Sequence, residues 1–197
     1  MRILYSLMII FIFPQHLIAS DFYLQGSLPI SQASAGKNSA LKNTFPARII
    51  TGFDLSKNFA IELGLTGLHT EQKSKKEDIV GQYHVKIDNQ DTLVGIKGQL
   101  HLNDNTMLYT RVGVLLWDTE LTVKESFWNE APDESIKAND NGAGYYVSVG
   151  YKRMLSDHIY LDLYLGHNQR NNIFEDSSTY PIDIRETLYG MGGGYQF

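Results

Sequence analysis

Apolar and polar residues alternate along eight separate stretches of this chain, with the period of two that a strand imposes. The clearest stretch is residues 186–197, where Tyr189, Met191, Tyr195 and Phe197 share one face with Gly193. The other seven alternating stretches are residues 22–28, 45–55, 59–69, 92–102, 106–123, 143–152 and 159–166. The pattern therefore predicts an all-β chain of eight strands.

The connections between these stretches alternate between long and short. Three of them are tight turns, at residues 56–58, 103–105 and 155–158. Four are long and polar, at residues 29–44, 70–91, 124–142 and 167–185. This asymmetry predicts an eight-stranded antiparallel up-and-down transmembrane β-barrel with short periplasmic turns and long extracellular loops. Residues 83–87 also alternate, so the hairpin around them is expected to extend beyond the membrane.

Two alternatives to this interpretation concern the ends of the chain. The last stretch could be the edge strand of a soluble sandwich, although Greek-key crossovers would not be expected to alternate in length this way. The N-terminus has a basic residue, Arg2, an apolar run at 3–13, Pro14, and the small residues Ala19 and Ser20. We interpret residues 1–20 as a secretory signal peptide and 21–197 as one barrel domain, the alternative being a buried core helix.

Composition narrows the chemistry that the chain can carry. Lys and Arg total 17 against 22 Asp and Glu, a net charge of −5, which argues against nucleic acid as a partner. There is no Cys, and the six His residues are scattered without metal-ligand spacing. We therefore expect no cofactor and no metal. The 12 Tyr, nine Phe and 17 Gly suit strands and an aromatic girdle.

Strand parity places eight charged side chains on the inward face, and their signs cancel. They are Arg48, Lys97, Arg111, Lys152, Asp54, Glu62, Asp162 and Glu186. Arg48 and Glu186 are expected to meet water at the rim, and Asp54 lies near a turn. The other five are predicted to form one network, in which Glu62 and Asp162 satisfy the three bases. Such a network would plug the lumen of a small barrel.

The stretch Leu108–Trp117 resembles the fifth strand of the transmembrane domain of outer membrane protein A. Residues 95–100 and 61–64 are similar to its fourth and third strands. The resemblance implies a charged barrel interior, and Glu62, Lys97 and Arg111 match family charges of the same sign. At Lys152 and Asp162 both signs are exchanged relative to the family pattern.

The end of the chain resembles the C-terminal signature of bacterial outer-membrane barrels. The matching residues are Tyr189, Met191, Tyr195 and Phe197. The resemblance implies a cell outer membrane location and recognition by the outer-membrane assembly machinery. We expect a monomer surrounded by outer-membrane lipid and lipopolysaccharide.

Three functions are compatible with such a barrel. The first is a structural and surface-interaction role, with extracellular loops that contact host or phage ligands. The alternative is a narrow pore or a channel for small hydrophobic solutes. A lipid A-modifying enzyme is the third, with His167 at a suitable height. The Ser expected two residues later is Gln169, and Ser177 and Ser178 have no fixed relation to His167, so we expect no enzyme.

Overall fold

The computed structural model describes residues 22–35, 39–40, 45–72, 81–127, 134–175 and 182–197. Its strands, in chain order, are β1 (Phe22–Ser27), β2 (Ile30–Ala35), β3 (Ser39–Ala40), β4 (Arg48–Ser56), β5 (Phe59–Gln72), β6 (Gly81–Asn103), β7 (Thr106–Phe127), β8 (Glu134–Met154), β9 (Ile159–Ile173) and β10 (Ile182–Gln196). None of the described residues belongs to a helix that is long and apolar enough to cross a membrane.

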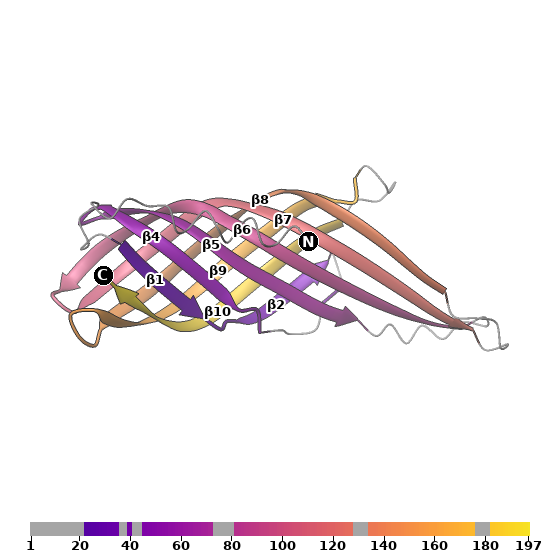
Figure 1. The fold of residues 1–197 in the computed structure, drawn as a ribbon, viewed down its shortest axis with the longest axis horizontal. Helices are drawn as coiled ribbons and strands as arrows, with labels where there is room; N and C mark the ends of the chain where they lie inside the picture. Colours follow the sequence, from indigo (N-terminus) through magenta and orange to yellow (C-terminus); the bar gives the residue numbers. More distant parts are fainter. Residues whose placement is uncertain (1–21, 36–38, 41–44, 73–80, 128–133, 176–181) are drawn as a thin grey trace.

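The strands close into a ring with eight positions (Figure 1). The order is β1, β4, β5, β6, β7, β8, β9 and β10, all antiparallel, and β1 pairs with both β4 and β10. The eight-stranded antiparallel up-and-down barrel expected from the sequence is confirmed. Its three short turns lie at one end, which we call the turn end, and we call the opposite end the hairpin end.

The first strand position is longer than the sequence indicated. Residues 29–44 were expected to form a loop, but β2 and β3 lie within them. β2 pairs with β10 on the side of β1 that is nearer the hairpin end. Proline has no N–H to donate, so Pro29 separates β1 from β2. Ile30 and Ser31 resume the alternation, with Ile30 exposed and Ser31 buried.

The three hairpins at residues 70–91, 124–142 and 167–185 are also largely strand rather than loop. β6 pairs with β7 as far as Gly81 and Phe127, and β7 with β8 as far as Glu125 and Glu134. Figure 1 shows β6, β7 and β8 continuing well past β9 and β10. We call this extension, residues 81–91, 118–127 and 134–143, the projecting sheet. The expected extension of the hairpin around residues 83–87 is therefore present.

The two faces of the ring differ as strand parity predicted. Apolar side chains such as Leu63, Val112 and Leu163 are about half exposed on the outer wall. Side chains of the opposite parity, such as Glu62, Arg111 and Asp162, are buried in the lumen. An apolar outer wall around a polar interior is the arrangement that lipid requires of a barrel.

Aromatic rings fill much of the lumen by lying against glycines in its wall. A Cβ added at Gly150 would lie 2.2 Å from the Tyr109 ring, and one at Gly52 would lie 2.2 Å from the Tyr23 ring. The ring therefore occupies the volume that a side chain on the neighbouring strand would need. By contrast, a Cβ added at Gly26 would meet no atom within 4 Å.

We predict that Gly150→Ala destabilises the barrel by about 1–3 kcal/mol, the usual cost of overpacking a filled interior. The added methyl group can be accommodated only if Tyr109 leaves its position against β8. Urea unfolding in phospholipid vesicles, followed by tryptophan fluorescence, measures the change.

Gly26→Ala is the matched control and should leave the unfolding midpoint almost unchanged. Equal midpoints for the two variants would show that the ring of Tyr109 does not depend on the absence of a side chain at residue 150.

Candidate functional site

Arg111 on β7 lies at the centre of the polar lumen and is only 2% exposed. Its Nε is 2.9 Å from a carboxylate oxygen of Glu62 on β5. Its two Nη atoms donate to the Tyr109 hydroxyl at 2.9 Å and to the Gln25 amide oxygen at 2.6 Å. The Gln25 amide nitrogen in turn donates to Asp162 at 2.6 Å. One guanidinium thus joins strands β1, β5, β7 and β9.

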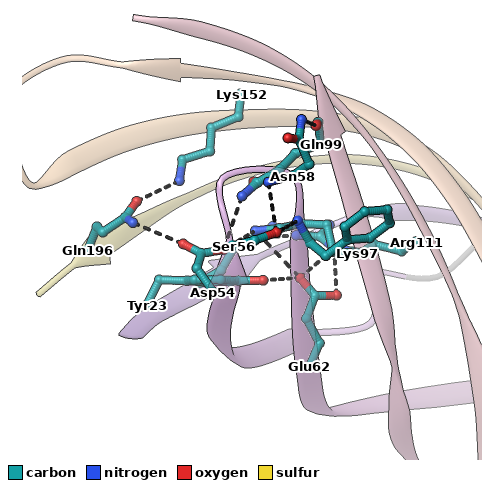
Figure 2. A network of polar contacts seen from close by, with 12 residues as sticks. Tyr23, Asp54, Ser56, Asn58, Glu62, Lys97, Gln99, Arg111, Lys152 and Gln196 are labelled. Atoms are coloured by element: carbon teal, nitrogen blue, oxygen red, sulfur yellow. Dashed lines mark hydrogen bonds and ion pairs between the residues drawn. The ribbon is translucent and has the colours of Figure 1, made fainter. Parts of the chain in front are cut away.

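The contacts continue toward the turn end, as Figure 2 shows. Lys97 Nζ lies 4.0 Å from carboxylate oxygens of both Glu62 and Asp54. Asp54 accepts a hydrogen bond from Gln196, which accepts one from Lys152 at 3.0 Å. We call the six charged residues in this connected set the lower network: Asp54, Glu62, Lys97, Arg111, Lys152 and Asp162.

Aromatic rings support the three bases of the lower network. Lys97 Nζ is 3.7 Å from the Tyr23 ring centroid, and Lys152 Nζ is 3.9 Å from that of Tyr160. The guanidinium of Arg111 lies 4.2 Å from the Tyr109 ring. Cation–π contacts of this kind are strongest where water is excluded.

The pairing inside the lower network differs from the sequence-based expectation. The structure buries the five predicted residues, but Lys152 and Asp162 form no ion pair within 4.0 Å, although they face each other across β8 and β9. The amides of Gln25 and Gln196 stand between the charges instead. Asp54, considered as a rim residue, belongs to the set and is 15% exposed at its side chain. Parity locates charges on a face but does not show which neutral side chains will bridge them.

A second charged cluster lies closer to the hairpin end and was missed from the sequence. Arg170 Nε donates to Asp91 at 2.9 Å, and its Nη2 lies 3.1 Å from Glu186. Asn168 and Ser31 complete the hydrogen bonds to Glu186. We call Asp91, Arg170 and Glu186 the upper network. Arg170 and Asp91 had been placed in loops, yet each continues the inward parity of its strand, Asp91 with Lys97 and Arg170 with Asp162.

The expectation that Arg48 and Glu186 face water at the rim is wrong. They are 2% and 1% exposed, because β2, β6 and β9 continue past them and extend the wall. The Arg48 guanidinium lies 5.5 Å from the ring centroids of both Tyr146 and Tyr164. It has no ion pair within 4.0 Å among the residues that the structure describes, and its Nε and Nη2 have no hydrogen-bond partner there. Arg48 therefore lies between the two networks, where the rings of Tyr146 and Tyr164 are its nearest partners among the described residues.

Beside and beyond the upper network the lumen holds an apolar cluster. Its buried residues include Leu93, Leu115, Trp117, Tyr146, Ile173, Phe174 and Ile184. Buried polar side chains continue past this level on the projecting sheet, where Thr119 donates a hydrogen bond to Asn89. The apolar cluster fills this part of the lumen as the lower network fills the turn end.

The four residues of the predicted assembly signal lie on the outer wall. Tyr189, Met191, Tyr195 and Phe197 are 43–66% exposed there. The Phe197 ring lies 5.5 Å from that of Phe22 on β1 and 4.9 Å from that of Tyr195. Its backbone N–H donates to the Phe22 carbonyl at 3.0 Å. The last residue thus lies where β10 meets β1 and the ring closes.

The outer wall around His167 carries no arrangement of a nucleophile and a base among the described residues. The ring of His167 lies 6.4 Å from that of Tyr145. The Tyr145 hydroxyl donates to Gln169, and Gln169 donates to Asn171. Ser177 and Ser178 lie outside the described residues, as do residues 1–20, for which a signal peptide stays a prediction. No group of three or more potential metal ligands occurs in the described part of the chain.

Solved structures with the same architecture come from several bacteria. Neisserial surface protein A is 14% identical, with a TM-score of 0.59 over 89% of this chain and 97% of that one. OprG, an outer membrane protein of Pseudomonas aeruginosa, is 12% identical, with a TM-score of 0.56 over 91% and 96%. Ail, the attachment invasion locus protein of Yersinia pestis, is 10% identical, with a TM-score of 0.54 over 91% and 100%.

At such low identity these likenesses establish the fold alone. No curated protein matches the chain. The sequence profile of the family described as "Outer membrane protein beta-barrel domain", however, matches residues 6–197, almost the whole chain. The chain therefore belongs to the outer membrane protein β-barrel domain family, and its location is the cell outer membrane.

Proposed function

We propose that this protein is a closed surface-interaction barrel, which uses its projecting sheet to contact ligands on host cells or phage. The observation that carries the proposal is the abrupt change of the outer wall along β7 and β8. The outward side chains of β7 from Leu108 to Leu116 are apolar except Thr110, and those of β8 are apolar at Tyr145, Val147 and Val149. Beyond Leu116 and Ala143 they are Asp118, Asn141 and Asn139. At about 3.3 Å per residue, the strands continue for roughly 30 Å past this change.

The composition of the projecting sheet supports contact with water and with polar partners. Lys137 donates a hydrogen bond of 2.9 Å to Glu120, which lowers the pKa of that carboxyl. Lys86 and Asp88 form another exposed pair at 2.8 Å. Exposed pairs of this kind stabilise little. A long sheet whose outward side chains carry mixed charges is suited to recognition of polar partners.

The register suggests a variant that removes the outer part of the projecting sheet without disturbing the barrel. Gln72 pairs with Val85, and Thr122 pairs with Lys137. Replacing residues 73–84 and 123–136 by Asn-Gly turns, which suit two-residue hairpins, should keep these pairs in register. We expect the shortened barrel to unfold at a similar urea concentration but to lose bacterial adherence to cultured epithelial cells or phage adsorption.

The control for this experiment replaces Asp104 and Asn105 at the turn end by the same dipeptide and should adhere like the wild type. Because the chain lacks Cys, Lys137→Cys provides a single thiol. An impermeant maleimide should label it on intact cells and should not label Asp104→Cys. Unchanged adherence of the shortened barrel, or the opposite labelling, would refute the surface role.

The two charged networks favour a closed lumen over the alternative of a narrow pore or solute channel. Six charged residues with cancelling signs and three tyrosines fill the turn end, and the apolar cluster fills the hairpin end. Glu62 is the acid on which the lower network most depends, since it meets Arg111, Lys97 and the hydroxyl of Tyr23.

Glu62→Ala should therefore destabilise the barrel by roughly 3–5 kcal/mol, because Arg111 remains buried without its carboxylate. It should also raise the leak conductance in planar bilayers. Glu120→Ala, which breaks an exposed pair on the projecting sheet, is the control and should change neither quantity. Large and steady single-channel currents from the wild-type protein would instead favour the pore.

We also propose that the aromatic residues at the end of β10 guide insertion by the assembly machinery. Phe197→Asp should block membrane insertion in cells more strongly than it lowers the stability of protein refolded in vitro, because Phe197 lies exposed on the lipid-facing wall. Leu24→Asp, on the outer wall of the neighbouring strand β1, is the control, because it tests whether any charge on that wall has this effect. Wild-type amounts of folded Phe197→Asp protein in the outer membrane would contradict the proposal.

A further inference from the structure

The outer part of β8 has a neighbouring strand on one side only. β7 pairs with β8 as far as Glu134, without a register shift. β9 leaves β8 much earlier, because the last pair between these two strands is Gly144 and Arg170 (Figure 1). Among the described residues, no strand other than β7 pairs with residues 134–143. We call this stretch of β8 the free edge.

Every second residue of the free edge directs its backbone N–H and C=O away from β7. At the turn end of β8 the Met154 N–H donates to the Asn105 carbonyl on the β7 side, at 2.8 Å. The direction of hydrogen bonding alternates along an antiparallel strand, and the ladder between β7 and β8 has no shift. The even-numbered residues of β8 therefore face β7. The odd-numbered ones face the opposite side, where β9 pairs only as far as Arg170.

The odd-numbered residues of the free edge lack a backbone partner on this open side. Ser135, Lys137 and Asn139 have none among the described residues. The N–H of Asn141 donates to the side chain of Asp140 at 2.9 Å instead of to a strand, which agrees with its place outside the ladder. A row of open N–H and C=O groups on an edge strand is a template for pairing with another strand.

The fold itself keeps β9 away from the free edge. The second carboxylate oxygen of Asp140 accepts the N–H of Phe174, so a side chain replaces backbone pairing there. Asn172 and Phe174 take φ angles of 57° and 66°, which turn the end of β9 away from β8. A cavity of about 390 Å³, lined by Asp140, Asn172 and Glu175 among others, lies in the resulting gap.

The side chains of the free edge differ between its two faces. Ile136 and Ala138 lie on the inward face, where Ile136 is 66% exposed and Ala138 packs against the apolar cluster together with Leu121. Lys137 and Asn139 lie exposed on the outward face. Side chains directly opposite each other on paired strands share a face. A strand added here would therefore suit alternating apolar and polar residues.

We propose that the free edge binds an extended segment of another protein as an added antiparallel strand. The backbone of that segment would bond to Ser135, Lys137 and Asn139, and its apolar side chains would lie beside Ile136 and Ala138. The open stretch is roughly 20 Å long at about 3.3 Å per residue, the length of an ordinary strand. In such complexes the main-chain hydrogen bonds provide affinity, and the alternate side chains provide selectivity.

This inference rests on the proposed function, since the hairpin end must face outward in cells, and it names the class of partner. A second copy of the chain in the same membrane suits the free edge less well. Both copies would direct β8 the same way, so their free edges could pair only in parallel. Parallel pairing is slightly less stable per residue than antiparallel pairing.

The test uses the whole barrel in phosphatidylcholine nanodiscs and a synthetic peptide of about eight residues, in which valine alternates with threonine and glutamate. Amide hydrogen exchange of the barrel is followed by NMR. We expect the peptide to slow exchange at Ser135, Lys137 and Asn139 about tenfold or more, because these N–H groups gain acceptors. The N–H groups of Ala138 and Asp140 already face β7 and should not change.

Two modified peptides test whether backbone pairing holds the segment. Residues that exchange both hydrogen bonds with Lys137 or Asn139 lie directly opposite them and share their polar face. N-methylation at the threonine and glutamate positions therefore blocks the peptide edge that faces β8 and should abolish the protection. N-methylation at the valines blocks the other edge and should leave the protection in place.

Two substitutions at one position of the barrel separate backbone from side chain. Asn139→Pro removes an N–H on the open side, where an edge strand tolerates proline. Asn139→Ala keeps that N–H. The proline variant should bind the peptide about tenfold more weakly, and the alanine variant should bind like the wild type. Both should unfold at the same urea concentration as the wild type.

Several outcomes would overturn the proposal. They are the absence of any protection, equal effects of the two N-methylated peptides on the wild-type barrel, and equal binding by Asn139→Pro and Asn139→Ala. Protection that appears without peptide and rises with barrel concentration would assign the free edge to a second copy instead.

Adherence separates this inference from the proposed function. Full-length Asn139→Pro should adhere less than Asn139→Ala. If the shortened barrel loses adherence while Asn139→Pro keeps it, the surface role stands and the free edge does not carry it. If the shortened barrel still adheres, the surface role fails, whatever the peptide does in nanodiscs.

Discussion

The interior of this barrel depends on one contact, the pairing of Arg111 with Glu62. Removing a guanidinium from water costs several kcal/mol unless acceptors surround it. Arg111 finds them on three strands, in Glu62, Tyr109 and Gln25. These residues meet only if the strands pair in the observed register, because a slip of one residue would turn every inward side chain outward. The charges therefore help to specify the register as well as to fill the lumen.

Filling that lumen also requires large side chains. A narrow ring of strands can hold them only if the neighbouring wall positions are glycines, which have no side chain. The tyrosines at 23, 109, 160 and 164 lie against glycines of neighbouring strands. The same rings contact the bases of the lower network and Arg48. Glycine, tyrosine and a buried cation thus form one repeated unit. The glycine leaves space for the tyrosine ring, and the ring lies against the cation. This explains why a chain with 17 Gly and 12 Tyr folds into a filled barrel.

Strand parity predicted the ring, the turns and the inward side of each charge from the sequence, because burial on one face imposes a strict period of two. It failed where the polar composition of a strand resembles that of a loop. Asp91 and Arg170 lie in strand segments whose outer face is polar, so the alternation of hydrophobicity disappears although the pairing continues. The bridging roles of Gln25 and Gln196 could not be predicted either, since they depend on the stagger between strands that are distant in sequence.

The two residues that strand parity missed, Asp91 and Arg170, also mark the level at which the interior of the barrel changes. Below Asp91 and Arg170 the three acids and three bases of the lower network are joined across several strands, and Arg48 lies against the rings of Tyr146 and Tyr164. Above them β8 and β9 part, and the inward side chains include Trp117 and Ile184 of the apolar cluster as well as the hydrogen-bonded pair of Asn89 and Thr119. The hairpin end therefore combines a cavity with polar walls and a sheet that continues past the apolar outer wall, and both are suited to contacts with molecules outside the barrel.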